Sequence, residues 1–432
     1  VGIDSMAPNP FITHMYTADP SAHVWADGRL YVYASHDIDP PRGCDLMDRY
    51  HVFSTDDMVN WTDHGEILNS SQVPWGRKEG GFMWAPDCAY KDGTYYFYFP
   101  HPSDTKWNNS WKIGVATSKE PAANFTVQGY IEGMDPLIDP CVFVDDDGQA
   151  YMYWGNPNVY YVKLNEDMIS YSGDIVKLSE RPKHYQEGPW TYKRNGHYYM
   201  AFASTCCPEG IGYAMSNTPT GPWETKGYIM RPTEKSRGNH PGIIDYKGNS
   251  YVFGLNYDLL RRETPEHRER RSVSVAKMTY NPDGTINEVP YWSETKLEQI
   301  GSFNPYRKVQ AVTMAWGYGL KTEQSANNKM YLTHIDNNEY LCVRGVDFGA
   351  KGAKKFIVNA ACDSMEGLIE IRLDGADGPL VGTVKVKPTG SSDIYELMSC
   401  SIKGAKQIHD LYLCFKSKKA NDLFKLDYWE FK

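Results

Sequence analysis

Residues 144–153 read Val-Asp-Asp-Asp-Gly-Gln-Ala-Tyr-Met-Tyr, and this stretch decides the fold because it recurs along the chain. In each copy Asp, Asn or Lys precedes a turn glycine and a tyrosine-rich strand follows, which is typical of a tight β-hairpin. The other copies occupy residues 25–33, 90–98, 192–200 and 245–253. The turn glycines are Gly28, Gly93, Gly148, Gly196 and Gly248, at intervals from 48 residues (148 to 196) to 65 residues (28 to 93).

A second, less regular pair of strand patterns follows each hairpin. Residues 52–54 lead to Trp61 in this way, and residues 212–215 lead to Trp223. Four strands in each of five repeats predict a five-bladed β-propeller, and helical periodicity is nearly absent. We expect residues 1–302 to form this domain.

The sequence changes its character beyond residue 302. Alternating apolar and polar residues at 341–346, 369–373, 381–386 and 410–415 predict antiparallel strands. Their number and spacing fit a separate β-sandwich over residues 303–432. The predicted chain is therefore all-β, with a propeller followed by a jelly-roll sandwich.

The amino-acid composition argues against two classes of binding partner. The chain has 432 residues, with 45 Lys and Arg against 54 Asp and Glu, so its formal net charge is −9. This balance argues against a nucleic acid or an anionic membrane surface as the partner. We see no apolar run long enough to span a membrane. Aromatic residues make up 14% of the chain, which suits either sugar stacking or a β-rich core.

The nine cysteines include no Cys-x-x-Cys pair, so a zinc site is not expected. Cys342, Cys362, Cys400 and Cys414 fall in one segment, and their pairing is left open. Val1 is not followed by a recognisable signal peptide, so the compartment has to be argued from function.

Five side chains occupy equivalent positions in the repeats. Asp19, Trp84, Asp139 and Glu187 each stand nine residues before a turn glycine, and His240 stands eight before Gly248. A proline follows each of them within two residues and stiffens the approach to the strand. We expect all five to surround one opening of the propeller channel, where radial repeats build binding sites.

Three carboxyl groups at one opening of the predicted channel point to glycoside hydrolysis. One acid protonates the leaving oxygen, a second activates water or attacks the sugar, and a third raises the pKa of the proton donor by repulsion. For any single acid, a solvated loop position is the more common explanation. The shared offset favours a catalytic cluster, while a non-catalytic, lectin-like propeller remains the alternative.

The motifs around these residues resemble glycoside hydrolase family 43 over residues 9 to about 300. They are Asp19-Pro-Ser, Trp84-Ala-Pro-Asp, Ile138-Asp-Pro with Phe143-Val-Asp-Asp-Asp-Gly, and Glu187-Gly-Pro-Trp. The resemblance implies a five-bladed enzyme that inverts the anomeric configuration. It implies Asp19 as general base, Asp139 as pKa modulator and orienting residue, and Glu187 as general acid.

The same resemblance bears on other residues of the propeller. His240, in Gly-Asn-His-Pro-Gly, is similar to a channel histidine that in many members lies beside a calcium or other ion, but its flanking residues differ from the commonest pattern. Arg271 resembles an arginine that reaches the substrate, although it ends a mixed charge run that suits a solvated loop. Asp87 is interpreted as structural. The invertase-like families are disfavoured because Asp19 follows Ala18 and Glu187 precedes Gly188.

The last segment resembles carbohydrate-binding module family 6, a β-sandwich that often carries calcium. The resemblance rests on Val346-Asp-Phe-Gly, Ile369-Glu-Ile-Arg-Leu-Asp, Leu411-Tyr-Leu-Cys-Phe-Lys and residues 422–431. It implies sugar contacts by Tyr395 and Asn421, with Tyr340 as the facing aromatic residue. Gln310-Ala-Val keeps the family's opening motif poorly, which weakens the expectation of a structural calcium. A sandwich that only packs against the propeller is the alternative.

These features together predict an inverting glycosidase that needs no cofactor for its chemistry. Its partner would be an oligo- or polysaccharide such as arabinoxylan or arabinan, from which it would release α-L-arabinofuranose or β-D-xylose. We expect a secreted or periplasmic monomer. Specificity should depend on the rim loops at 37–49, 75–82 and 101–111, with Trp75, Trp107 and Trp111 as subsite walls.

Overall fold

The computed structural model describes residues 9–37, 47–105, 110–134, 138–205, 208–234, 239–263 and 271–432. The predicted all-β class is confirmed. Within the described residues, helix is confined to α1 (Asp258–Glu263) and to short 3₁₀ turns such as η2 (Ser70–Gln72) and η4 (Trp292–Glu294). None of the helices in this part of the chain is long and apolar enough to cross a bilayer.

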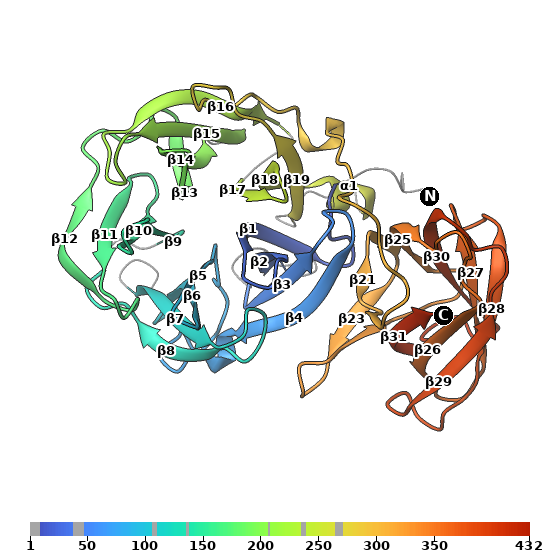
Figure 1. Ribbon diagram of the computed structural model, residues 1–432. Coiled ribbons are helices and arrows are strands. Elements are labelled where there is room, and N and C mark those ends of the chain that lie inside the picture. The colour runs from blue at the N-terminus through green and yellow to red at the C-terminus, as the bar shows by residue number, and fades with distance from the viewer. Residues whose placement is uncertain are drawn as a thin grey trace.

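Five antiparallel sheets are arranged in a ring around a common axis (Figure 1). Their strands, sheet by sheet, are β1 (Tyr16–Val24), β2 (Leu30–Asp37), β3 (Arg49–Thr55) and β4 (Trp61–Asn69); β5 (Asp87–Lys91), β6 (Thr94–Pro102), β7 (Trp111–Ser118) and β8 (Thr126–Tyr130); β9 (Cys141–Val144), β10 (Ala150–Trp154), β11 (Tyr160–Leu164) and β12 (Tyr171–Lys177); β13 (Tyr185–Arg194), β14 (His197–Ser204), β15 (Glu209–Ser216) and β16 (Glu224–Thr233); and β17 (Gly242–Tyr246), β18 (Asn249–Asn256) and β19 (Ser272–Met278). The first strand of each sheet lies nearest the axis.

The repeated hairpin builds the two inner strands of every sheet. Gly28 lies between β1 and β2 with a φ of 79°, and the other four turn glycines adopt φ angles of 82° to 86° between the corresponding strands. A residue with a Cβ is strained in this left-handed region, which explains the glycine. Buried aromatic and aliphatic side chains, including Tyr33, Tyr153 and Trp154, then fill the space between neighbouring sheets.

The N-terminal segment completes the last sheet of the ring. Asn9 exchanges two hydrogen bonds with the backbone of Val275 through its side chain, and Phe11 N–H donates to the Val273 carbonyl. These contacts cover the open edge of β19. The first and last parts of the ring are thereby joined, since β1 also packs against β17, β18 and β19.

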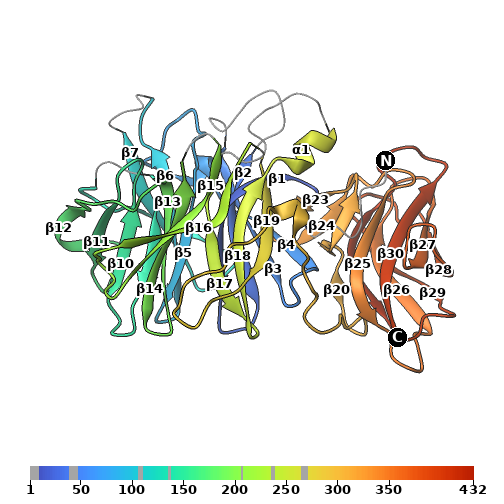
Figure 2. The ribbon, with the colours of Figure 1, turned by 90° about the horizontal axis from the view of Figure 1, so that it is seen from above.

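The remaining strands form two sheets that pack around a second hydrophobic core (Figure 2). One sheet has the order β23-β24-β31-β26-β29, with β20 also paired to β31, and the other has the order β22-β25-β30-β27-β28. The strands are β20 (Val309–Gln310), β22 (Trp316–Tyr318), β23 (Lys321–Gln324), β24 (Met330–Thr333), β25 (Tyr340–Asp347), β26 (Lys355–Ala361), β27 (Gly367–Leu373), β28 (Leu380–Val386), β29 (Tyr395–Ser401), β30 (Ile408–Ser417) and β31 (Lys425–Phe431). Between β20 and β22, β21 (Thr313–Met314) belongs instead to the first sheet of the ring.

Polar contacts join the two parts of the chain. Strand β21 pairs with β4 of the first ring sheet, although it lies beyond the predicted boundary at residue 302. The Asn60 side chain donates to the Arg344 carbonyl at 2.9 Å and accepts from its N–H at 2.8 Å. Gln324 binds the Glu66 backbone in the same reciprocal way. The sandwich is therefore fastened to the ring along its side.

The four cysteines of the sandwich are free thiols. Cys342, Cys362 and Cys414 are buried, and Cys400 is half-buried. The disulfide pairing that the sequence left open is therefore not present among them. The buried thiols behave as small apolar groups that pack with neighbouring side chains.

Candidate active site

The five residues at equivalent repeat positions lie at the entry to the five innermost strands. Asp19 belongs to β1 and Glu187 to β13, whereas Trp84, Asp139 and His240 lie just before β5, β9 and β17. The backbone is irregular there: Asp19 and Asp139 have φ angles of 55° and 61°, and the register shifts at both Asp19 and Glu187. Bulged entries of this kind re-aim side chains next to functional sites.

The three acids converge on His240. Its Nε2 atom lies 3.6 Å from Asp19 Oδ1 and 3.8 Å from Glu187 Oε1. One oxygen each from Asp139 and Glu187 and one ring nitrogen of His240 lie within 4.8 Å of one another. Side chains from four different sheets therefore meet in one place, as the common offset predicts.

Asp19 is fixed by donors on both of its oxygens. Ser35 Oγ donates to Oδ2 at 2.7 Å, and Arg271 Nη1 lies 3.3 Å from Oδ1. The carboxyl group is almost fully buried. Ser35 lies on β2, directly behind Asp19, and is not marked by the repeat offset.

Arg271 is held by a second acid that the sequence did not single out. Asp37 accepts its backbone N–H at 2.7 Å and its Nε and Nη2 groups at 3.0 Å each. This fork leaves Nη1 to reach Asp19. Arg271 is buried, so the alternative of a solvated loop position is wrong. Its described contacts orient an acid of the site.

Asp139 is a second buried carboxyl group of the site. Burial raises its pKa, and the charges of Glu187 and Asp19 raise it further, against the opposing effects of His240 and the Gly188 N–H. Its Oδ2 atom is buried without a hydrogen-bond partner in the described part of the chain. Asp139 therefore favours the protonated form, which a crowded carboxyl group can share with its neighbours.

Glu187 is the most accessible acid, with 17% of its side chain exposed. Asn156 Nδ2 donates to Oε2 at 2.8 Å, and Gln186 Nε2 lies 3.4 Å from the Asn156 oxygen. The following residue must be glycine, because a Cβ on Gly188 would lie 2.5 Å from His240 Nδ1. Asn156 lies in the loop after β10, where the sequence offered no repeat position that would have marked it.

His240 is the cation of the cluster. Burial alone would lower its pKa, but Asp139, Asp19 and Glu187 together raise it to about 9. A protonated ring nitrogen cannot ligate a metal. One nitrogen and two carboxylates also differ from the six to eight oxygen ligands that calcium takes, so these side chains alone do not fit a calcium ion.

Trp84 lies just before β5 in a group of aromatic residues. Its ring centroid is 4.9 Å from that of Trp111 and 5.7 Å from that of Phe82, and Arg77 lies over Phe82. Trp111 therefore packs beside Trp84. Trp75 instead stacks on Phe99 within the sheet packing. Trp107 and parts of the loops at 37–49 and 101–111 lie outside the described residues.

Asp87 is structural, as interpreted from the sequence. His23 Nε2 lies 2.7 Å from its Oδ1, and its Oδ2 accepts the Val142 N–H at 2.7 Å. Asp87 thus ties β1 and β9 to β5 and keeps the inner strands in register.

The sandwich separates two of the expected sugar contacts. Tyr395 belongs to the β29 sheet and stacks on Tyr331, whereas Tyr340 belongs to the β25 sheet and stacks on Tyr318. The pairing of Tyr340 with Tyr395 is therefore wrong, because sequence patterns alone do not assign strands to one sheet or the other. Asn421 is exposed in the loop between β30 and β31.

The loop that carries Asn421 lies beside residues 336–338. The Asn337 N–H donates to the Ala420 carbonyl at 2.9 Å, and the Asp422 N–H donates to Asp336 Oδ1. Residues 336–338 lead directly into Tyr340.

The start of the sandwich does not fit the implied calcium ion. Asp427 lies next to Tyr428, which pairs with Gln310, and its Oδ2 already receives Lys329 Nζ and Asn359 Nδ2 at 2.8 Å each. Val312, in place of an acid, is buried. An ammonium group thus compensates the carboxylate that a cation would need.

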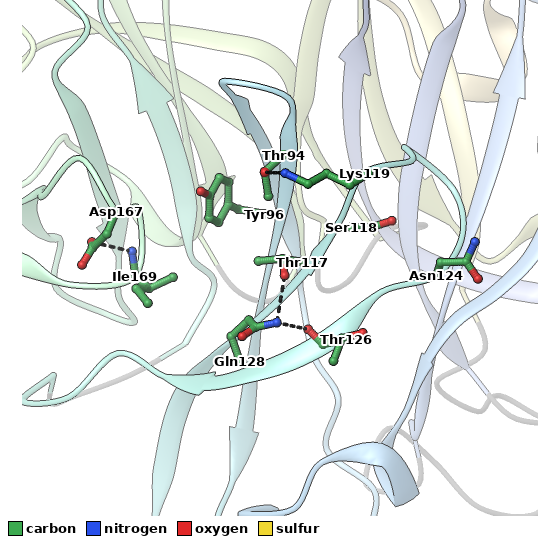
Figure 3. Close-up of a pocket in the computed structure, with 10 residues that line it drawn as sticks. All are labelled: Thr94, Tyr96, Thr117, Ser118, Lys119, Asn124, Thr126, Gln128, Asp167 and Ile169. Atoms are coloured by element: carbon green, nitrogen blue, oxygen red, sulfur yellow. Dashed lines mark hydrogen bonds between the residues drawn. The ribbon is translucent and has the colours of Figure 1, made fainter.

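A pocket on the outer wall of the ring lacks this chemistry. It encloses about 490 Å³ and is lined by Thr94, Tyr96, Thr117, Ser118, Lys119, Asn124, Thr126, Gln128, Asp167 and Ile169 (Figure 3). Its acid, Asp167, accepts the N–H groups of Ile169 and Ser170 in its own loop. No second carboxyl group lines this pocket, so it cannot supply an acid and a base.

Five radial sheets with three acids and a histidine at one end of the inner strands define a glycosidase-type site. Family models agree: glycosyl hydrolases family 43 matches residues 7–286, and carbohydrate binding module family 6 matches residues 310–432. The chain belongs to glycosyl hydrolases family 43 and is a glycoside hydrolase.

Known relatives share both parts of the chain. An arabinoxylan arabinofuranohydrolase from Bacillus subtilis (strain 168) is 32% identical over 98% of this chain and 92% of its own. A crystal structure of such an enzyme from Bacillus subtilis, in complex with cellotetraose, superposes with a TM-score of 0.86 at 30% identity and covers 98% of this chain and 97% of its own. Xylosidase/arabinosidase 43A of Humicola insolens is 33% identical but covers only 64% of this chain and 98% of its own.

Proposed function

We propose that the ring is a five-bladed β-propeller over residues 1–302, followed by a β-sandwich over residues 303–432, and that the enzyme removes arabinofuranosyl units from arabinoxylan with inversion. The fold proposal is supported by five radial sheets whose inner strands face one axis. The substrate is supported by relatives with both parts, which are named arabinoxylan arabinofuranohydrolases. Release of xylose is the second activity in the group, carried by relatives that match the propeller.

Glu187 suits the role of general acid. Asn156 occupies Oε2 as a donor, so the proton belongs on Oε1, and the partial exposure of the side chain lets the glycosidic oxygen approach. The acid gives this proton to the leaving xylose oxygen as the bond to the arabinose anomeric carbon breaks.

Asp19 suits the role of general base. Arg271 and Ser35 hold its oxygens, which fixes the direction of the carboxyl group. It takes a proton from the water that attacks the opposite face of the sugar. An inverting pair leaves room for this water, at a separation of about 6.5–9.5 Å.

Asp139 and His240 set the local charge between the general acid Glu187 and the general base Asp19. Burial and the neighbouring acids raise the pKa of Asp139, and His240 lies between Asp19 and Glu187, where the surrounding carboxyl groups favour a positive charge on its ring. Asp139 Oδ2, which has no partner among the described residues, is free to bind a sugar hydroxyl. Trp84 and Trp111 provide an apolar face for a sugar ring. These groups need no cofactor.

The observation that carries this proposal is the convergence of Asp19, Asp139 and Glu187 around His240. Proton NMR of a digest of wheat arabinoxylan tests it. We expect free arabinose whose first-formed anomer is β, inverted from the α-linked side chain. Retention of the α anomer would contradict the assignment of Asp19 as a base, and absence of any released sugar would favour the lectin-like alternative.

We further propose that one chain is the working unit, since all the named groups come from the same chain. A polymeric substrate that cannot cross a membrane supports a secreted or periplasmic location. The sandwich is proposed to hold the polysaccharide through the loops that carry Tyr340 and Asn421, because these loops lie side by side.

A further inference from the structure

A further carboxyl group lies beside the site without a role in the reaction described above. Glu209 begins β15, in the same sheet as Glu187, and only 2% of it is exposed. It does not stand at the offset shared by the other acids. Charged side chains are almost never buried to this extent unless they have a specific partner.

The partner of Glu209 is the backbone directly before His240. The Asn239 N–H donates to Glu209 Oε2. On the other side, Asn239 Oδ1 accepts the Leu255 N–H from β18 at 3.1 Å. Asn239 itself is fully buried, and a Cβ on Gly254 would lie 2.6 Å from its Oδ1. The residue before His240 is therefore clamped between β15 and β18.

The electrostatic surroundings show which groups Glu209 faces. The pKa of Glu209 is raised to about 7, because burial and the Glu187 charge raise it more than the Asn239 N–H, His240 and Arg271 lower it. The charges of Glu187, His240 and Arg271 therefore all act on the Glu209 carboxyl group. A buried carboxyl group placed for stability alone would gain nothing from lying beside Glu187.

We propose that Glu209 is a positioning residue that fixes His240 between the general acid and the general base by holding the Asn239 N–H. His240 Nε2 is 3.6 Å from Asp19 and 3.8 Å from Glu187, so a small shift of its backbone would unbalance both contacts. Misplacement of this size far from the bond that breaks can cost about a hundredfold in rate. The inference rests on the proposed function.

Two substitutions separate the hydrogen bond from simple packing. Glu209→Gln keeps an oxygen that accepts the Asn239 N–H, whereas Glu209→Leu keeps much of the volume but has no acceptor. We expect Glu209→Leu to lower kcat on an arabinoxylan oligosaccharide by about 10- to 100-fold with KM changed less than threefold. Glu209→Gln should restore kcat to within about threefold of the wild type.

Asp57→Leu is a matched control. Asp57 is also 2% exposed and also accepts backbone N–H groups, from Val59 and Asn60, but it lies by the sandwich. We expect this variant to lower the melting temperature and to leave kcat within about twofold of the wild type.

Two results would overturn the proposal. One is a Glu209→Leu enzyme that melts earlier but keeps the wild-type kcat, as the control does. The other is a Glu209→Gln enzyme as slow as Glu209→Leu. Failure of the proposed function is distinct from both, because then the wild-type enzyme itself would release no sugar.

Discussion

Two buried histidines of this molecule lie beside carboxyl groups, and their surroundings differ. His14 Nε2 is 2.8 Å from Asp63 Oδ2, Thr322 donates to the same oxygen, and the Gly65 N–H donates to the other. His240 instead lies more than 3.5 Å from Asp19 and Glu187. One cluster is saturated with hydrogen bonds and the other is crowded with acids.

The two clusters shift the pKa of their acids in opposite directions. Burial would raise the pKa of Asp63, but the His14 hydrogen bond and charge hold it well below its usual range. Burial and like charges raise the pKa of Asp139 instead. Asp63, which has donors on both oxygens, joins the sandwich to the ring. Asp139 has an Oδ2 atom without a hydrogen-bond partner among the described residues, and we expect this oxygen to be available to a substrate.

The largest expected effect separates the two clusters by activity. Glu187→Gln removes the transferable proton while keeping the shape, so kcat on arabinoxylan oligosaccharides should fall by about 10³-fold or more, with binding largely intact. Steady-state kinetics and calorimetric titration with the oligosaccharide measure the two quantities. Asp167→Asn, in the outer pocket, serves as the control and should retain full activity. Wild-type rates for Glu187→Gln would remove this residue from its role.

A smaller effect, on stability, is expected at the other cluster. Asp63→Asn leaves His14 and Thr322 without their buried charged partner and should destabilise the chain by about 3 kcal/mol. Thermal unfolding should show a melting temperature several degrees lower, while kcat stays within about twofold of the wild type. A variant with unchanged stability but impaired catalysis would break the distinction between the clusters.

The pH dependence of stability should differ in sign between the clusters. The pKa of His240 is raised to about 9, so its stabilising contribution is complete below about pH 6.5 and is lost as the pH rises through 9. The raised pKa of Asp139 acts in the same direction. We therefore expect the melting temperature to fall between pH 7 and pH 9, and to fall less in His240→Asn. An equally steep fall in that variant would contradict the assignment.

Asp63 has a lowered pKa, so its contribution is present above its unfolded value and is lost only as the pH falls through the folded value. The acid limb of the stability profile should therefore flatten in Asp63→Asn and remain unchanged in His240→Asn.

The smallest expected effect concerns metals. The acids around His240 and the Lys329–Asp427 pair do not fit a calcium ion. Excess EDTA should therefore change neither kcat nor the melting temperature by a measurable amount. Recovery of a lost activity by added calcium would show that a cation completes one of these sites.

The parts of the molecule that repeat could be predicted from the sequence. A turn glycine at a fixed offset marks each inner hairpin, and the same offset brings Asp19, Asp139 and Glu187 together. Asn156, Asp37 and Glu209 could not be found in this way, because each acts from a position that no other repeat shares. Their roles depend on how loops and second strands approach the axis, which is set by packing.

The sandwich shows the same limit. Its strands could be recognised by alternation, but alternation does not say which sheet a strand joins, so Tyr340 and Tyr395 were wrongly paired. Strand β21 also pairs with β4 of the ring rather than with its own neighbours, since Thr313 meets Thr62 there. Contacts between distant segments decide both cases.

The most direct test of the central claim is a crystal structure of the Glu187→Gln enzyme soaked with an arabinoxylan oligosaccharide. The arabinofuranosyl ring should lie between Asp19 and residue 187, with a hydroxyl on Asp139 and the xylose chain against Trp84 and Trp111. A sugar bound only in the outer pocket or on the sandwich, with the cluster around His240 empty at saturating ligand, would contradict the account.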